Sequence, residues 1–324
     1  MLCSAVMKEQ GKNIRLVHNP AAGDDSNGDK DELCQLIEDL GHNCTVVTKK
    51  DAVKKIDPQT DIIALAGGDG TIRMTIMGLL EKKLRFKRPI AILPQGTANN
   101  IAISLGIPLD CEKAIGLWRN ALLKKFDVGM VIGLEKKPLY FIESIGFGVF
   151  PTLIKKMDKK KTEDLSAEDE IKTALRQLRK LVETFPATTL RLTVAGNNYE
   201  KECILVEIMN IPSIGPRLVL AADADPGDGQ FDIIIVTVDQ RQELISYIDG
   251  LLNGTNVEFK IIPIRTNRLA MEWEGKEIHI DDERKSYFGQ QLKLTLLHGI
   301  VEIITGNKYD TISANDNGSK NVLF

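Results

Sequence analysis

A glycine-rich turn with one acidic residue follows an apolar run in DIIALAGGDGTIRM, residues 61–74. Gly67, Gly68 and Gly70 can adopt backbone angles closed to other residues, and they let main-chain amides approach phosphate oxygens. The helix expected to follow adds a positive N-terminal end. Asp69 among such amides is electrostatically costly unless a cation lies between it and the phosphates, which indicates a magnesium-linked role. A tight strand-to-helix turn without a ligand is the alternative for this segment taken alone.

Two more loops of similar chemistry follow predicted strands, NPAAG at residues 19–23 and LPQGTANN at residues 93–100. Because the carboxyl ends of parallel strands meet at one edge of a sheet, we expect the three loops to converge there. Thr97 repeats the hydroxyl chemistry of the first turn, and Asn99 is expected to cap the helix that begins with NIAISLG. Ordinary capping is the alternative for both residues. The spacing of P-loop and Rossmann fingerprints is missing, which disfavours those enzymes.

The elements that would position these loops alternate in type along the first part of the chain. Short β-branched runs such as IRLVHNP and PIAILPQG alternate with helical patterns such as DELCQLIEDLG. This rhythm predicts βαβ units, and we assign residues 11–128 to an α/β domain with a mainly parallel sheet.

The second part of the chain has a different rhythm, with strand patterns that follow one another directly. Hairpin turns are expected at Gly196-Asn197-Asn198 and at Glu274-Gly275, which predicts an antiparallel β-sandwich over residues 129–297. Leu175, Leu178 and Val182 recur at helical spacing and predict an amphipathic helix. The lysines around residues 155–161 are interpreted as a solvated loop, with contact to an anionic membrane surface as the alternative.

Composition restricts the classes of protein. The chain has 324 residues, 43% hydrophobic and 27% charged, with a formal net charge of −3, which argues against general capture of nucleic acid. The five cysteines are scattered and form no Cys-x-x-Cys pair, so we expect reduced thiols and neither disulfides nor a zinc site. No segment resembles a signal peptide or a membrane span, and we expect a cytoplasmic protein. Residues 307–324 are expected to be disordered.

The motifs NPAAG, GGDGT and LPQGTANN, in this order and spacing, resemble the diacylglycerol kinase catalytic family, which includes YegS-like lipid kinases and the cores of sphingosine and ceramide kinases. GGDGT alone is shared with NAD kinases and nearly with phosphofructokinases, so LPQGTANN and the hairpin-rich second half discriminate. The resemblance implies an α/β ATP-binding domain of the NAD kinase and phosphofructokinase type, a β-sandwich domain, a lipid cleft between them, and a chain that returns to the first domain at about residues 298–306.

The resemblance also implies roles for individual residues. Glu283 in IHIDDERK would accept the proton of the attacking hydroxyl, beside Asp281 and with Asp69 at the phosphates. Asp228 in DADPGDGQFD would supply the carboxylate ligand of a structural Mg²⁺, with Asp225 and Gln230 contributing backbone carbonyls, although acidic turns often bind no metal. The nucleotide would contact Asn19, Pro20, Gly23, Thr48, Gly67, Gly68, Asp69, Gly70, Thr71, Arg73 and Thr97.

The chain departs from the family pattern near the phosphates and near the expected base. Asp282 replaces the glycine of Asp-Gly-Glu, and its charge is expected to raise at least one neighbouring carboxyl pKa, including that of Glu283. Arg73 and Met74 replace Asn-Glu, and Asn100 replaces the aspartate of GTAND. Arg73 is expected to neutralise phosphate directly.

The leading hypothesis is an ATP- and Mg²⁺-dependent lipid kinase that phosphorylates a hydroxyl of a diacylglycerol-like or sphingoid lipid at a membrane surface, with which it associates transiently. A kinase of a soluble metabolite such as NAD is one alternative. A non-catalytic nucleotide or lipid sensor of the same fold is the other. The sequence leaves the acceptor lipid and the oligomeric state open, with a homodimer among the alternatives.

Overall fold

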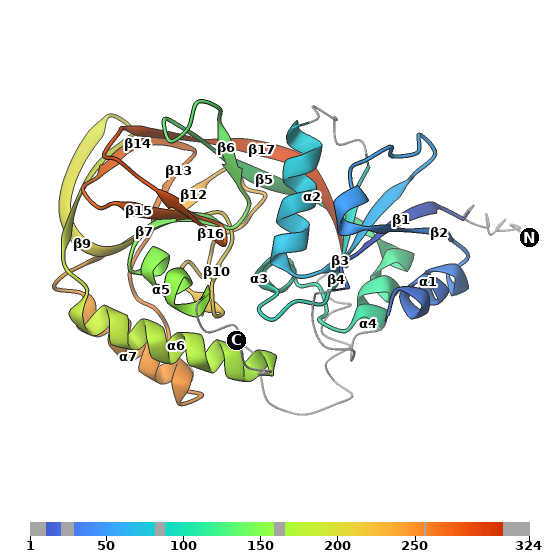
Figure 1. The fold of residues 1–324 in the computed structure, drawn as a ribbon, viewed down its shortest axis with the longest axis horizontal. Coiled ribbons are helices and arrows are strands. Elements are labelled where there is room, and N and C mark those ends of the chain that lie inside the picture. The colour runs from blue at the N-terminus through green and yellow to red at the C-terminus, as the bar shows by residue number, and fades with distance from the viewer. Residues whose placement is uncertain (1–10, 21–28, 82–87, 159–165, 256, 307–324) are drawn as a thin grey trace, which may run out of the picture.

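The computed structural model describes residues 11–20, 29–81, 88–158, 166–255 and 257–306. Two domains lie side by side, and two long strands, β5 (Leu122–Ile132) and β17 (Leu292–Thr305), run from one into the other (Figure 1). The expected domain boundary at residue 128 falls inside β5, so the domains are joined by a continuous two-stranded ribbon.

The first domain is built on a parallel sheet with the strand order β2-β1-β3-β4-β17. β3 and β4 are buried along their whole length, which explains why their sequences, IIALAG and IAILP, are continuous apolar runs. The strands are β1 (Asn13–His18), β2 (Asn43–Thr48), β3 (Ile62–Gly67) and β4 (Ile90–Pro94). The helices are α1 (Lys30–Asp39), α2 (Asp69–Glu81), α3 (Asn100–Ser104) and α4 (Cys111–Gly116), with short 3-10 helices at Lys49–Asp51 and Leu117–Asn120.

The second domain is an antiparallel β-sandwich with helices on one outer face. One apolar core, with Phe147, Trp273 and Tyr287, fills the sandwich, and a second packs α5, α6 and α7 against β9 and β12. The helices are α5 (Val149–Asp158), α6 (Ala167–Thr184) and α7 (Arg241–Leu252). The remaining strands are β6 (Leu139–Phe141), β7 (Ser144–Gly148), β8 (Thr188–Val194), β9 (Asn197–Met209), β10 (Ser213–Ile214), β11 (Leu218–Val219), β12 (Phe231–Thr237), β13 (Ile264–Thr266), β14 (Arg268–Trp273), β15 (Glu277–Ile280) and β16 (Glu283–Ser286).

The ribbon between the domains contains a β-bulge in β17. Its pairing with β5 shifts between Leu297 and Val301, and Gly299 in this bulge has a left-handed φ of 60°. The buried carboxylate of Asp127 on β5 accepts hydrogen bonds from the Gly299 and Gly229 amides and contacts His298 Nδ1 at 2.9 Å. After the bulge, Ile303 pairs with Ile90 of β4. The last described strand therefore belongs to the parallel sheet of the first domain.

Two of the expected turns differ from the structure. The β8–β9 turn consists of Ala195 and Gly196, both with positive φ, and the two asparagines after them already belong to β9. The predicted hairpin around Glu274-Gly275 is wrong, because β14 pairs with β8 and β17 whereas β15 pairs with β7 and β16. The prediction failed because a Glu-Gly turn can connect two strands that pair with each other or two strands that pair with different neighbours.

Two expectations about side chains are also corrected. Cys34 on α1 and Cys44 on β2 form a disulfide with a Cα–Cα distance of 5.7 Å, whereas Cys111 and Cys203 are buried thiols. Lys155 lies in helix α5 rather than in a loop. The predicted amphipathic helix is confirmed as α6, which buries Leu175, Leu178 and Val182. Residues 159–165 and the expected disordered tail lie outside the described residues.

Candidate active site

A cavity of about 590 Å³ lies between the two domains. One end is polar and is lined by Asp69, Gly70 and Thr97 of the first domain together with residues 143–144 and 281–282 of the second. Most of the remaining lining comes from α5, α6 and the 214–216 segment and is mainly apolar, with Asp158, Glu170 and Thr173 as its polar members. The cavity therefore joins the predicted phosphate loops to an apolar wall.

The glycine loops are shaped by close packing. Gly68 and Gly96 meet so closely that a Cβ on Gly68 would lie 2.8 Å from the Gly96 Cα. A Cβ on Gly67 would lie 2.5 Å from Thr71 Oγ1. None of the three glycines of GGDGT has a positive φ, so the expected unusual backbone angles are wrong. Gly67 is needed because Thr71 of α2 leaves no room for a Cβ, and Gly68 is needed because the loops after β3 and β4 touch. Gly70 faces the cavity near Asp282.

Asp69 begins α2 and caps a different helix. Its two carboxylate oxygens accept hydrogen bonds from the main-chain N–H groups of Asn100 (2.9 Å) and Ile101 (3.0 Å), at the start of α3. Burial raises the pKa of Asp69. The predicted cap by Asn99 is wrong, because Asn99 has a left-handed φ of 54° and its side chain instead bonds both main-chain groups of Gly96. The capping bonds thus give Asp69 a structural role that needs no cation.

The LPQGTANN loop is held by the second domain. Thr97 Oγ1 donates to Glu170 of α6 at 3.0 Å, and the Arg217 guanidinium donates to the carbonyls of Thr97 and Ala98. Asn100 donates to the Gly215 carbonyl at 3.1 Å, which an aspartate could not do. The side chain at residue 100 therefore contributes to the contact between the domains.

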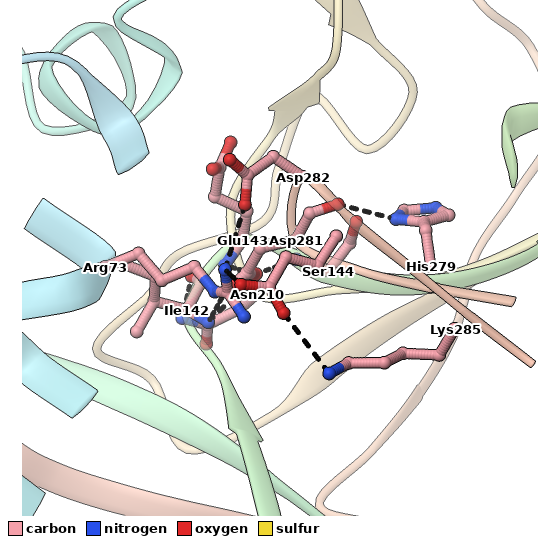
Figure 2. Close-up of polar contacts among 10 residues, drawn as sticks. Arg73, Ile142, Glu143, Ser144, Asn210, His279, Asp281, Asp282 and Lys285 are labelled. Carbon is pink, nitrogen blue, oxygen red and sulfur yellow. Dashed lines mark hydrogen bonds and ion pairs between the residues drawn. The ribbon is translucent and has the colours of Figure 1, made fainter. Parts of the chain in front are cut away.

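Asp281 fixes the turn between β15 and β16. Its side chain is buried and accepts hydrogen bonds from the amides of Ile142, Glu143 and Ser144. These residues form the connection from β6 into the start of β7. Burial raises the pKa of Asp281 to about 6, against the opposing effect of Arg73 and these amides. Figure 2 shows Arg73 reaching this turn from one side and Lys285 lying on the other.

Arg73 contacts the acidic turn between β15 and β16, and its expected contact with phosphate stays a prediction. Its Nε lies 3.0 Å from Asp281 Oδ2 without hydrogen-bond alignment, and its Nη1 contacts Asp282 at 3.0 Å and Glu283 at 2.9 Å. Burial opposes the charge on Arg73, but the three carboxylates raise its pKa above the ordinary value. Lys285 Nζ is a further partner of Glu283 at 3.3 Å. Three acidic side chains of this turn therefore share one guanidinium, and Glu283 has Lys285 as a second cation.

The expected effect of Asp282 on carboxyl pKa values is confirmed for its buried neighbours and wrong for Glu283. Burial, with a smaller contribution from Asp282, raises the pKa of Asp69 and of Glu143. Glu283 behaves in the opposite way, because its hydrogen bond with Arg73 lowers its pKa. Glu283 is not among the residues that line the cavity. Its assignment as the base stays a prediction, with its carboxylate directed at two cations.

A buried His–Glu pair contacts the main chain of the turn between β15 and β16. His279, Gly146 and Glu207 are paired in one row across β15, β7 and β9, and because Gly146 has no side chain the outer two meet over it. His279 Nε2 lies 2.8 Å from Glu207 Oε1, and His279 Nδ1 donates to the Asp281 carbonyl at 2.7 Å. Although burial opposes the imidazolium, Glu207 raises the pKa of His279. The pair therefore fixes the main chain of Asp281.

The expected metal loop is compensated by protein cations. Asp225 contacts Lys124 Nζ at 2.8 Å, and Asp228 contacts the Arg265 guanidinium. The same carboxylates accept hydrogen bonds from the amides of Gly227 and Gln230 within the loop. In the described part of the chain, no group of three or more His, Cys, Asp or Glu side chains is arranged to hold a metal ion. Of the expected ligands, the Asp228 carboxylate is engaged by Arg265, and a metal ion at this loop stays a prediction.

The remaining predicted nucleotide residues are only partly brought together. Asn19 Nδ2 donates to Thr71 Oγ1 at 3.1 Å, which joins the end of β1 to α2. Pro20 follows on the surface. Thr48, at the end of β2, donates to Asp51 within its own loop. Gly23 lies outside the described residues.

Several residues of this site lie in no motif that marks them as functional in the sequence, including Glu143, His279, Glu207 and Arg217. Glu143 was the most visible of them, as a lone acid inside the apolar run LYFIESIGFG. An acid within a strand pattern is expected to be either paired or functional when it is buried. The other three are recognised only once the strands are placed beside one another.

The chain thus combines an α/β domain with a β-sandwich, and glycine-rich loops of the first domain line the cavity between them. Residues 13–131 match the diacylglycerol kinase catalytic domain, and residues 157–293 match the YegS C-terminal NAD kinase beta sandwich-like domain. The chain belongs to the diacylglycerol kinase catalytic family, and it is a lipid kinase, a phosphotransferase.

Individual relatives agree with this family. The chain is 28% identical over 295 residues to a diacylglycerol kinase of Bacillus subtilis (strain 168), covering 84% of this chain and 90% of that one. It is 27% identical over 244 residues to a diacylglycerol kinase of Staphylococcus aureus (strain bovine RF122 / ET3-1), covering 72% and 73%.

Solved structures show the same fold. A crystal structure of a diacylglycerol kinase from Bacillus anthracis str. Sterne superposes with a TM-score of 0.67 at 23% identity and covers 93% of this chain and 99% of that one. Yeast NADH kinase complexed with NADH gives a TM-score of 0.52 at 11% identity, covering 98% and 91%. The predicted fold class, an α/β domain with a mainly parallel sheet followed by a β-sandwich, is confirmed.

Proposed function

We propose that the chain transfers the γ-phosphoryl group of Mg–ATP to a hydroxyl of a diacylglycerol-like or sphingoid lipid. The observation that carries this proposal is the single cavity that joins the N-terminus of α2, at Asp69 and Gly70, to an apolar wall on α5 and α6. A phosphoryl donor and an apolar acceptor could meet there without leaving the protein.

The nucleotide end suits phosphate because α2 is 13 residues long and its N-terminus opens on the cavity. The positive end of a helix favours anions. Several carboxylates line the same end, so we propose that ATP enters as its magnesium complex, which would reduce repulsion with the triphosphate. Bound Mg²⁺ would supply charge neutralisation of the phosphates.

The acceptor end suits a lipid chain because Phe150, Leu153, Ile154 and Ile171 line it. Burying such surface against an acyl or alkyl chain is favourable at about 25 cal/mol per Å². Among the described residues no helix is long and apolar enough to cross a membrane. We propose that the lipid is taken from a membrane surface at which the protein binds transiently.

A direct test is incubation of the purified chain with γ-labelled ATP and Mg²⁺, in parallel with dispersed diacylglycerol, a sphingoid base and NAD. We expect label in lipid product and none in NAD. Label in NAD alone would replace the lipid kinase by a kinase of a soluble metabolite. ATP binding without turnover on any acceptor would instead favour a sensor.

A further inference from the structure

His279 on β15 and Glu207 on β9 are ionisable side chains in the interior of the second domain. His279 is 3% exposed and Glu207 is fully buried. The two meet over Gly146 of β7, where an added Cβ would lie 2.0 Å from Glu207 Oε1. The pair can therefore form only because residue 146 has no side chain.

The stability of the sandwich does not explain this pair. Glu207 Oε2 is buried and has no hydrogen-bond partner in the part of the chain that the structure describes. A buried polar atom without a partner lowers stability and calls for a reason other than packing. Apolar residues of similar volume are often as stable as a buried ion pair, or more so. The reason for the pair is therefore sought in what it holds in place.

The pair holds the main chain of Asp281. This residue has a left-handed φ of 51°, a conformation that is unfavourable for a residue with a side chain and persists where the surroundings fix it. Its N–H donates to the Ser144 carbonyl at 2.8 Å, and its carbonyl accepts from His279 Nδ1 at 2.7 Å. Because a carbonyl only accepts, Nδ1 carries a proton, and Glu207 fixes the imidazole ring at Nε2.

The turn held in this way carries acidic residues of the candidate active site. Asp281 and Asp282 line the polar end of the cavity, and Glu283, the predicted base, follows as the first residue of β16. Since only Asp281 and Asp282 separate β15 from β16, a shift of the Asp281 carbonyl would also move Glu283. A displacement of about 1 Å at a reacting group can lower a rate about 100-fold.

We propose that His279 and Glu207 are positioning residues for phosphoryl transfer. They hold the Asp281 carbonyl, and through it the main chain from which Glu283 extends, while Glu283 keeps its predicted role as the base. His279 also packs against Phe150 of the apolar wall, with 5.9 Å between the ring centroids, so its ring lies where the turn meets that wall. This assignment rests on the proposed lipid kinase function.

The first test replaces both members of the pair, in the double variant Glu207→Met/His279→Leu. Because apolar replacement of a buried pair is often neutral or stabilising, we expect the melting temperature to stay at or above that of the wild type. We expect kcat for lipid phosphorylation to fall about 10- to 100-fold, and the KM for Mg–ATP to stay within a factor of about three. A pair with only a structural role would leave kcat unchanged in a folded protein.

Two single variants separate the two hydrogen bonds of the imidazole. In His279→Asn the amide nitrogen is attached to Cγ, as Nδ1 is in histidine, and can donate to the Asp281 carbonyl. In His279→Gln it lies one bond further out, near the place of Nε2, and can reach Glu207 instead. We expect His279→Asn to retain the higher kcat and His279→Gln the higher melting temperature.

A third comparison asks whether the pair acts through Glu283. In a Glu283→Gln background, the double variant should lower kcat by less than about twofold further, because residues that act as a unit are not additive. Tyr247→Phe is the control in the wild-type background. Tyr247 is also 3% exposed and bonds the main chain of Val219, but neither of these two residues lines the cavity, and kcat should not change.

The outcomes distinguish this assignment from the proposed function. A folded double variant with normal kcat overturns the assignment, and so does a full further loss of kcat in the Glu283→Gln background. If the double variant does not fold, a kcat for His279→Asn no higher than that for His279→Gln overturns it. In each case wild-type lipid turnover keeps the proposed function. A wild-type chain with no lipid turnover overturns both.

Discussion

Two acidic regions of this chain are built in opposite ways. In the loop at residues 225–230, Asp225 faces Lys124 and Asp228 faces Arg265. At the polar end of the cavity, Asp69 and Glu143 are buried carboxyls whose pKa values are raised by burial, and neither contacts a cation at ion-pair distance among the described residues. Each of these loop carboxylates faces a cation of the protein, whereas the carboxyls of Asp69 and Glu143 do not.

The difference indicates where a ligand is needed. A buried charge without a counter-ion lowers stability, and proteins keep such groups mainly at functional sites. A compensated acidic loop needs no ligand to be stable. By this reasoning the cavity, and not the 225–230 loop, is the region in which a ligand that brings a cation, such as the Mg²⁺ of Mg–ATP, would change the energetics most.

The largest expected effect comes from removing the Arg73 guanidinium, which contacts the acidic turn between β15 and β16 at the polar end of the cavity. Arg73→Met would leave the buried Asp281 carboxylate without its counter-ion, and breaking such a pair costs about 3 kcal/mol or more. Urea denaturation measures this loss. Arg284→Met is the control, because the Arg284–Glu277 pair is about one-third exposed on both sides and should cost about 1 kcal/mol or less. Equal losses in both variants would contradict this view of the turn.

A smaller loss of stability is expected for Asp69→Ala, because both capping bonds to α3 disappear. Loss of an N-cap costs about 0.5–2 kcal/mol, so the melting temperature should fall along with lipid kinase activity. Asp69→Asn keeps one acceptor and should retain more of the stability. If Asp69→Ala melted at the wild-type temperature, the capping role would be wrong.

The compensated loop allows a test by pH. Burial raises the pKa of Asp232 to about 6, and Arg265 opposes this shift across 3.4 Å. A raised carboxyl pKa gives stability that is fully present below about pH 4 and lost as pH rises through about 6. In Arg265→Met the loss should extend to higher pH, measured as melting temperature against pH. An identical profile in wild type and variant would show that Arg265 does not control this acid.

The smallest effect is expected on removing divalent cations from the ligand-free protein. Because Lys124 and Arg265 already face the loop carboxylates, EDTA should leave the melting temperature unchanged within error. A clear drop restored by Mg²⁺ would show that Asp225, Asp228 and Gln230 hold a structural metal after all, as the family resemblance implied.

Features that depend on residues close together in the sequence can be predicted from it, whereas contacts between residues far apart in the sequence cannot. The parallel sheet and the amphipathic helix α6 follow from local periodicity, and both are present. The partner of Arg73 could not be predicted, because Asp282 is 209 residues away. The β14–β15 connection was misread because a turn does not say which strands its flanks will join. Glu143 lies within an apolar run, and the interruption between β6 and β7 at this residue is set by its contact with Asp281, which is distant in the sequence.

The central claim is that the uncompensated polar end and the apolar wall form one cavity that holds the lipid. Ala174 of α6 lines that wall, whereas Ala167 at the exposed start of the same helix does not. In an Ala174→Phe variant shown to keep the wild-type fold, the KM for lipid should rise about tenfold or more, because a bulky side chain fills part of the pocket. The dissociation constant of ATP should not change. Ala167→Phe should leave both unchanged. An Ala174→Phe enzyme with the wild-type KM for lipid would contradict the account.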